Sequence, residues 1–274
     1  MTKRIVTGAG LGALLLLAIW LGGWVFAVLW IACVCIALYE MFHVISCAGH
    51  DIVAWPTWVA LLIAIPGFLL LTQVPGLLLL VILVAATLLL VTTLVIFSRE
   101  PKLEDLLTSL LPLFCVALTG MSLLGMTRIT PATTQRVYMS LAFFIPVIGD
   151  LAAFFVGIRY GKTKLNPPVS PNKTIEGALA GLAGSVLTAC AVYAVGRWAG
   201  APLPRFFHFP LMGLLGGAAG QIGDLFASLV KRHCKVKDYS QIFPGHGGML
   251  DRLDSILFAG TLVFLYQAIP QTIR

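Results

Sequence analysis

The residues best suited to chemistry lie between Ser228 and Ser255, in a segment with strongly apolar runs on both sides. Its charged and titratable residues are Lys231, Arg232, His233, Lys235, Lys237, Asp238, His246, Asp251, Arg252 and Asp254. Charge beside a hydrocarbon layer costs free energy, so a functional role is the first interpretation of this segment.

The spacing of five residues in and before this segment defines two helical faces. Asp224, Ser228 and Lys231 follow the pattern i, i+4, i+7, which places an acid, a hydroxyl and a cation on one face. Asp251 and Asp254 are three residues apart and face the same way from the first turn of the next helix. A purely structural ion pair would need only two of these groups.

A glycine-rich turn separates the two helices. Pro244-Gly245 and Gly247-Gly248 allow backbone conformations in which successive N–H groups bind an anion. Carboxylates hold Mg²⁺, while ammonium, guanidinium and N–H groups hold phosphate. The combination predicts a polyphosphate ligand carried on a hard divalent cation. The sequence has no G-x-x-x-x-G-K-[ST] loop and no His/Cys set at zinc spacing, which argues against a P-loop site and a zinc centre.

A second candidate region lies earlier in the chain. Asp150 interrupts an apolar run, where a carboxylate is expected to face a wet cavity or a cation rather than lipid. A structural acid bonded to a neighbouring helix is the alternative. In the loop that follows, Asn172 or Thr174 could cap the next helix, and Lys173 would then lie beside a helix end that favours phosphate. An ordinary basic loop is the alternative for Lys173.

The composition is that of a membrane protein. Of the 274 residues, 59% are hydrophobic and 11% charged, and the mean hydropathy is +0.98, whereas soluble domains are about a quarter charged. The expected fold class is all-α, a polytopic integral membrane protein with about nine transmembrane helices. The candidate spans are residues 5–21, 24–40, 56–72, 75–97, 105–126, 137–158, 175–196, 209–231 and 253–270. The first is expected to be retained, because no small-residue cleavage site follows it.

The distribution of basic residues predicts an orientation. With the N-terminus inside, 13 of the 18 Lys and Arg residues fall on the inner side. The positive-inside rule then places loops 159–174 and 231–252 together in the cytoplasm and the C-terminus outside. Nucleic-acid binding is disfavoured, because the charge lies in short interhelical loops.

The chain is expected to divide into two regions. Residues 1–97 are N-terminal transmembrane helices with small residues at four-residue spacing, suited to packing and to lipid or dimer contacts. Residues 98–274 form the catalytic transmembrane region. Whether the protein is a homodimer stays open.

The six cysteines form no C-x-x-C pair. Cys234 lies between His233 and Lys235, where neighbouring cations could lower the pKa of its thiol. An incidental loop cysteine is the simpler interpretation.

Two stretches resemble a known family. Ser228-x-x-Lys231-Arg232-x4-Lys237-Asp238-x-Ser240-x-x-Phe243-Pro244-x-His246-Gly247-Gly248-x-x-Asp251-Arg252-x-Asp254 resembles the signature of the phosphatidate cytidylyltransferase (CDP-diacylglycerol synthase) family. Ser170-Pro171-Asn172-Lys173-Thr174-x-Glu176-Gly177 resembles a second stretch of the same family. The first match spans about 27 residues at fixed spacing and is far more specific than a short motif. Residues 1–100 add nothing specific to it.

The resemblance implies a reaction and a cofactor. In that family, CTP and phosphatidate give CDP-diacylglycerol and pyrophosphate in phospholipid biosynthesis, with Mg²⁺, and the likeness assigns metal binding to Asp224 and Asp251. It also implies a bacterial-type inner membrane location with the active site on the cytoplasmic side. The expected partners are CTP, phosphatidate and membrane lipid, with no nucleic acid.

Spacing and resemblance together give the site assignments. The residues assigned to catalysis are Asp224, Lys231, Arg232, Lys237, Asp238, His246, Asp251 and Arg252. The residues assigned to substrate binding are Asp150, Ser170, Asn172, Lys173, Thr174, Ser228, Gly247 and Gly248. The expected metal ligands are Asp224, Asp251 and Asp254. Asp238 and Asp254 could hold a second cation or orient the basic residues of the site.

Two other functions remain open. One is a cytidylyltransferase for a different lipid phosphate. The other, from a different class, is a transporter of a phosphorylated solute. Transporters usually place their site near the midplane and often show internal repeats, whereas here the charge gathers at one surface and no repeat is visible.

Overall fold

The computed structural model describes residues 2–71, 73–243, 245 and 247–268. The longer helices are α1 (Thr2–Leu21), α2 (Gly23–Cys47), α3 (Trp55–Leu70), α4 (Gln73–Ile96), α7 (Ala132–Tyr160), α8 (Ile175–Trp198), α9 (His208–His233) and α10 (Leu250–Ala268). One further rod combines α5 (Leu103–Pro112), the π-helical turn η1 (Leu113–Leu118), α6 (Thr119–Gly125) and the 3₁₀ turn η2 (Met126–Arg128). The helical class predicted from the composition is therefore confirmed.

Within the described residues, six helices are long and apolar enough to cross a membrane. They cover Gly23–Cys47, Leu78–Ile96, Leu103–Arg128, Ala132–Tyr160, Ile175–Trp198 and His208–His233. The other predicted spans, 5–21, 56–72 and 253–270, correspond to α1, α3 and α10 but are not in this set.

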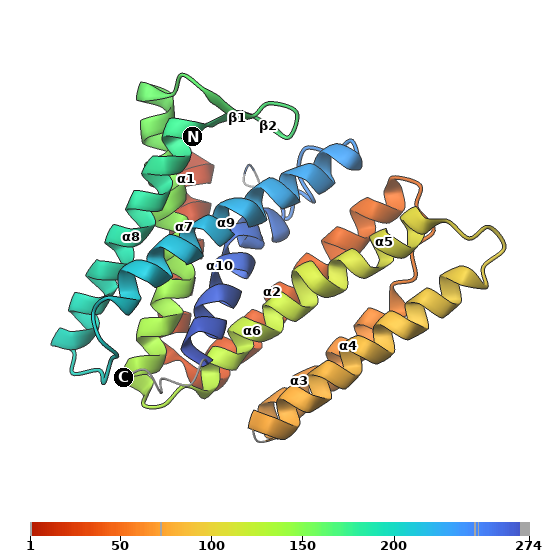
Figure 1. The fold of residues 1–274 in the computed structure, drawn as a ribbon, viewed down its shortest axis with the longest axis horizontal. Helices are drawn as coiled ribbons and strands as arrows, with labels where there is room; N and C mark the ends of the chain where they lie inside the picture. The colour runs from red at the N-terminus through yellow and green to blue at the C-terminus, as the bar shows by residue number, and fades with distance from the viewer. Residues whose placement is uncertain (1, 72, 244, 246, 269–274) are drawn as a thin grey trace.

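The C-terminal helices form a closely packed group. Helices α7 and α8 lie side by side, α9 crosses them, and α10 packs against α9 and α7 (Figure 1). Small residues permit this approach: a Cβ at Gly213 would lie 2.8 Å from the backbone oxygen of Ser185. The α3–α4 hairpin packs on the α5–η1 part of the long rod, away from α7 and α8 (Figure 1).

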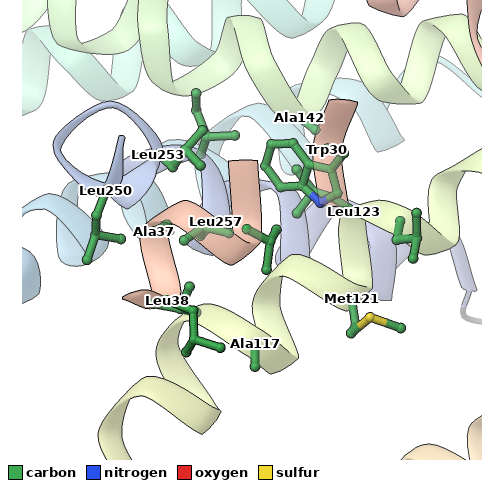
Figure 2. Packing of buried hydrophobic residues seen from close by; sticks show 14 of the residues in the cluster. Trp30, Ala37, Leu38, Ala117, Met121, Leu123, Ala142, Leu250, Leu253 and Leu257 are labelled. Carbon is green, nitrogen blue, oxygen red and sulfur yellow. The ribbon is translucent and has the colours of Figure 1, made fainter. Parts of the chain in front are cut away.

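Helix α2 belongs to the core that supports α10. Figure 2 shows Leu250, Leu253 and Leu257 of α10 near the α2 segment that carries Ala37. On the opposite side, the indole Nε1 of Trp30 donates to the carbonyl of Gly120 in α6 at 2.8 Å. The N-terminal region is thus in direct contact with the helix that carries two of the predicted site acids.

The loop after α7 contains the one departure from an all-α fold within the described chain. Strands β1 (Lys164–Asn166) and β2 (Ser170–Thr174) pair antiparallel, with Lys164 opposite Thr174 and Asn166 opposite Ser170. Pro167 and Pro168 form the turn between them, and proline favours extended backbone over helix. The all-α expectation misses this ribbon because a three-residue strand has no hydrophobic periodicity to detect.

Candidate active site

A cavity of about 650 Å³ lies between α7, the β1–β2 ribbon, α8 and α9. Its polar lining residues are Asp150, Lys164, Asn172, Lys173, Thr174, Gln221 and Asp224. After Asp150, the part of the lining that α7 supplies is apolar, and the side chains of Phe154 and Ile158 are 60% and 71% exposed. The cavity therefore joins a charged interior to an apolar outer surface.

An ion pair between Lys173 and Asp224 closes the polar end of this cavity. Lys173 comes from β2 and Asp224 from α9, so the two regions singled out in the sequence meet at one place. The ribbon is fixed to α8 by local capping. Thr174 Oγ1 accepts from the Gly177 N–H at 3.1 Å, and the Glu176 carboxylate accepts from the amides of Lys162 and Thr163. Of the two residues predicted as possible caps, Thr174 is the cap; Asn172 lies in β2 and lines the cavity.

Three carboxylates from three helices gather at this ion pair: Asp224, which belongs to it, and Asp150 and Asp254. The Ser255 hydroxyl lies 3.3 Å from Asp150 Oδ2 and 3.2 Å from Asp254 Oδ1, so it links α7 to α10. Asp224 is near enough to Asp150 and Asp254 for their charges to repel one another. Asp150, predicted to bind substrate, therefore shares its surroundings with two of the predicted metal ligands.

Asp251 is held differently from the other acids. Its Oδ1 accepts from Lys231 Nζ at 2.6 Å, and its Oδ2 accepts from the N–H groups of Tyr239 and Gly248 at 2.9 Å each. Only 5% of its side chain is exposed. Asp251 thus fastens the end of α9 and two points of the following loop to the first turn of α10. A metal ion could reach Asp251 only if some of these partners moved away.

In the turn predicted to bind an anion, some N–H groups already donate to acceptors within the protein. The Phe243 N–H donates to the carbonyl of Gly247 at 3.0 Å, and Gly247 has a φ of +82°, which only glycine adopts easily. The Gly248 N–H points at Asp251 instead of a free ligand position. His246 and Pro244 lie outside the described residues.

The remaining predicted residues differ in their exposure. Ser228 and Lys231 are half-buried on the α9 face that carries Asp224. The exposed ones are Arg232, Lys237, Asp238 and Arg252. Their side chains are open to a solvent-borne ligand. Ser170 is half-buried in β2.

Two polar residues at the site were missed by the sequence analysis. Gln221 lines the cavity and donates to the carbonyl of Ala178 at 2.9 Å. Glu40 of α2 is 1% exposed and accepts hydrogen bonds from Ser240, Met249 and Leu250. An acid within an apolar helix was a usable signal, but the predicted span 24–40 put Glu40 at a helix end, whereas α2 continues to Cys47.

Of the two interpretations of Cys234, the lowered pKa is wrong, and the simpler one, an incidental cysteine, fits the structure. Cys234 is buried, and burial raises the pKa of its thiol because a thiolate loses hydration there. Tyr239, in the same loop, is also buried. Burial, followed by the charges of Asp254 and Asp251, raises the pKa of its phenol, whose oxygen donates to the Ala227 carbonyl at 3.1 Å.

Comparison with known proteins identifies relatives of one name and one family. A "Phosphatidate cytidylyltransferase" of Bacillus subtilis (strain 168) is 44% identical over 117 residues, which are 43% of this chain and 41% of that protein. Proteins of the same name from Brucella suis and Staphylococcus aureus (strain COL) are 40% and 42% identical over 48% and 44% of this chain. The aligned part spans 48% and 45% of those two proteins, so the chain spans about half the length of the curated relatives it matches. The profile of the cytidylyltransferase family, in contrast, matches residues 2–269, and the chain therefore belongs to the cytidylyltransferase family.

Proposed function

We propose that this protein transfers the cytidylyl group of CTP to phosphatidate and releases pyrophosphate, giving CDP-diacylglycerol for phospholipid biosynthesis. Family membership supports nucleotidyl transfer, and the names of the relatives support phosphatidate as the acceptor. The observation that carries the proposal is the cavity closed by Lys173 and Asp224, because it combines a charged end with an apolar mouth on a membrane helix.

The two ends of the cavity suit the two parts of a lipid phosphate. The phosphate would lie near Lys173, where a cation and the N-terminus of α8 both favour an anion. The acyl chains would leave between the exposed side chains of Phe154 and Ile158 into the surrounding lipid. The exposed cations of the 231–252 loop would then bind the triphosphate of CTP.

The carboxylates fit Mg²⁺ as a cofactor. Proteins usually hold Mg²⁺ through one or two carboxylates, with waters and substrate phosphates completing the octahedron. Asp224 and Asp254 offer such oxygens, and no three Asp, Glu, His or Cys side chains of the described chain form a complete metal centre alone. We assign Asp224 and Asp254 as ligands, with Asp251 joining if Lys231 releases it; Asp238 is the candidate for a second cation. When bound, Mg²⁺ neutralises charge on the phosphates.

The chain's own residues act mainly by positioning and electrostatics. An oxygen of the lipid phosphate forms a bond to the α-phosphorus of CTP, and the bond from that phosphorus to the β-phosphate oxygen breaks. The nucleophile is already an anion at neutral pH, so no general base is required. The cations assigned to hold the phosphates in line are Lys173, Lys231, Arg232, Lys237 and Arg252. His246 is assigned a hydrogen bond to phosphate or a role in the shape of its turn.

The site requires loops 159–174 and 231–252 to lie on the same side of the membrane, since Lys173 of the first loop contacts Asp224 in the half of α9 that leads into the second loop. We place that side in the cytoplasm, with the N-terminus inside, the C-terminus outside and nine helices in a bacterial cell membrane. Self-association as a dimer is a further part of the proposal.

The decisive experiment measures pyrophosphate release by the purified protein in mixed micelles. CTP is supplied with phosphatidate, with a polyprenyl phosphate, or with no lipid, and the Asp224→Asn variant serves as the inactive control. Turnover with phosphatidate alone supports the proposal. Turnover only with another lipid phosphate would select the related activity, and no turnover with any of them would leave transport of a phosphorylated solute to be measured in liposomes.

A further inference from the structure

The most buried acid near the site comes from the N-terminal region, for which the sequence predicts packing and lipid or dimer contacts. Glu40 lies on α2, 1% exposed, and all of its described hydrogen bonds reach residues at least 200 positions later. The Ser240 hydroxyl donates to Oε1 at 2.5 Å, the Met249 N–H donates to Oε1 at 2.9 Å, and the Leu250 N–H donates to Oε2 at 2.8 Å.

These donors lie at the two ends of the turn that precedes Asp251. Helix α10 begins at Leu250, and Met249 directly precedes it; the N–H groups at the start of a helix have no partner within the helix. A carboxylate satisfies such groups and interacts favourably with the positive end of the helix. Ser240 lies at the other end of the turn, next to Tyr239. Glu40 therefore fixes both ends of the segment 240–250.

A second carboxylate completes the same arrangement. Asp251 holds the neighbouring amides of Tyr239 and Gly248 and the ammonium of Lys231. The two acids thus divide these amides between them. The N–H groups of Tyr239 and Gly248 donate to Asp251, whereas those of Met249 and Leu250 donate to Glu40.

The close approach also explains one glycine of the signature. A Cβ at residue 248 would lie 2.6 Å from Glu40 Oε1 and 2.7 Å from Oε2, closer than carbon and oxygen atoms pack. Gly248 is therefore needed for the contact of the turn with α2, besides any contact with a substrate.

We propose that Glu40 is a positioning residue: by anchoring the turn 240–250 to α2, it sets the placement of Asp251, Asp254 and Lys231 for catalysis. The catalytic part of this inference rests on the proposed cytidylyl transfer; the anchoring part does not. Glu40 acts through Asp251 and the start of α10 and does not itself face the cavity between α7 and α9.

The test is Glu40→Gln, which keeps the shape of the side chain but replaces one oxygen with a donor that meets an N–H group. A residue that only fills space would tolerate this change. For positioning, we expect kcat to fall by roughly 10- to 100-fold, as for groups that orient a ligand-binding side chain, with the KM for lipid phosphate within about twofold, because the cavity itself is untouched.

Hydrogen exchange followed by mass spectrometry provides a readout that needs no activity. In Glu40→Gln, amides of residues 239–251 should exchange faster, while those of α7 and α8 keep their wild-type rates. The matched control is Glu100→Gln, which removes the same charge from an exposed acid paired with Lys102 and should change neither readout. Should Glu40→Gln fail to fold, Ser240→Ala removes one of the three hydrogen bonds and should give a smaller increase in exchange on the 240 side of the turn.

The outcomes separate the two proposals. A wild-type protein without CTP turnover sinks the proposed function, and the exchange data alone then decide whether Glu40 anchors the turn. Wild-type kcat and wild-type exchange in Glu40→Gln would overturn the inference. Faster exchange spread equally over α7 and α8 would also overturn it, since it would assign Glu40 to general stability.

Discussion

Lys173 and Asp224 form an ion pair that joins strand β2 to helix α9, and each side chain is only about a quarter exposed, at 28% and 26%. The contact joins two segments with different patterns in the sequence. Lys173 belongs to a basic loop, and Asp224 belongs to a glycine-rich helix. A cation from Lys173 already faces Asp224, so a metal ion that uses this carboxylate has to share it with the ammonium group or displace it.

Asp224→Asn should reduce turnover by roughly 100-fold or more, the scale of losing a group that stabilises developing charge. The unfolding free energy should change by about 1 kcal/mol or less, because the pair with Lys173 is partly exposed to solvent. CTP turnover and unfolding in mixed micelles measure the two effects. Near wild-type turnover at saturating Mg²⁺ would remove Asp224 from the site.

Asp251→Asn should also lose turnover but, unlike Asp224→Asn, it should lower the unfolding free energy clearly. The pair with Lys231 is largely buried, with 14% and 5% of the side chains exposed, and removal of one partner of such a pair costs about 3 to 5 kcal/mol. The same unfolding assay compares it with Asp224→Asn. Equal stability of the two variants would contradict the role of Asp251 in fastening the loop.

The orientation of the chain can be tested by labelling single introduced cysteines in whole cells, in a background with the six native cysteines replaced by serine. Cysteines at Lys164 and Ile242, both exposed, should react only from the cytoplasmic side, and one at Arg205 only from outside. Reaction of the first two from opposite sides would refute a single site built by both loops.

Cys234 should react slowly with thiol reagents. Burial raises its pKa, so less thiolate is present at a given pH, and the reaction rate should keep rising with pH beyond the range of an ordinary thiol. Cys47, which is exposed, provides the comparison in the same sample. Peptide mass spectrometry after timed maleimide treatment at pH 7 to 9 gives both rates. Faster labelling of Cys234 than of Cys47 at pH 7 would contradict its burial.

Transfer should be a single in-line displacement with inversion at the α-phosphorus and no cytidylylated enzyme. A covalent step on His246 would add a second displacement without removing a difficult one. His246→Ala should therefore retain measurable turnover. Protein labelled by CTP carrying a radioactive α-phosphate in the absence of lipid, or net retention of configuration, would count against this mechanism.

The sequence was enough to predict a helical protein with several apolar helices and to single out both charged regions, because apolar runs and charge spacing are local properties. It could not predict which groups become partners. Asp251 and Asp254 share a helical face by spacing, yet Asp251 bonds Lys231 and loop amides, whereas Asp254 bonds Ser255 near Asp150. That division depends on how three helices cross, which no local pattern encodes.

The end of α2 illustrates the same limit. An acid at residue 40 is a reasonable helix boundary when only its neighbours in sequence are considered. The helix continues to Cys47 because the carboxylate is satisfied by donors from the start of α10. A residue that depends on distant partners is therefore assigned to the wrong environment until the tertiary structure is known.

The hydrogen bonds of Glu40 also have a consequence for biosynthesis. Leu250 is made 210 residues after Glu40, which at about 5 to 20 residues per second is a delay of roughly 10 to 40 s. Throughout that interval α2 carries a carboxylate in an apolar helix without the donors it has in the finished protein. Chains interrupted before residue 240 should therefore be poorly retained in the bilayer and removed by membrane proteases. Stable insertion of α2 therefore depends on synthesis of α10, the last helix of the chain.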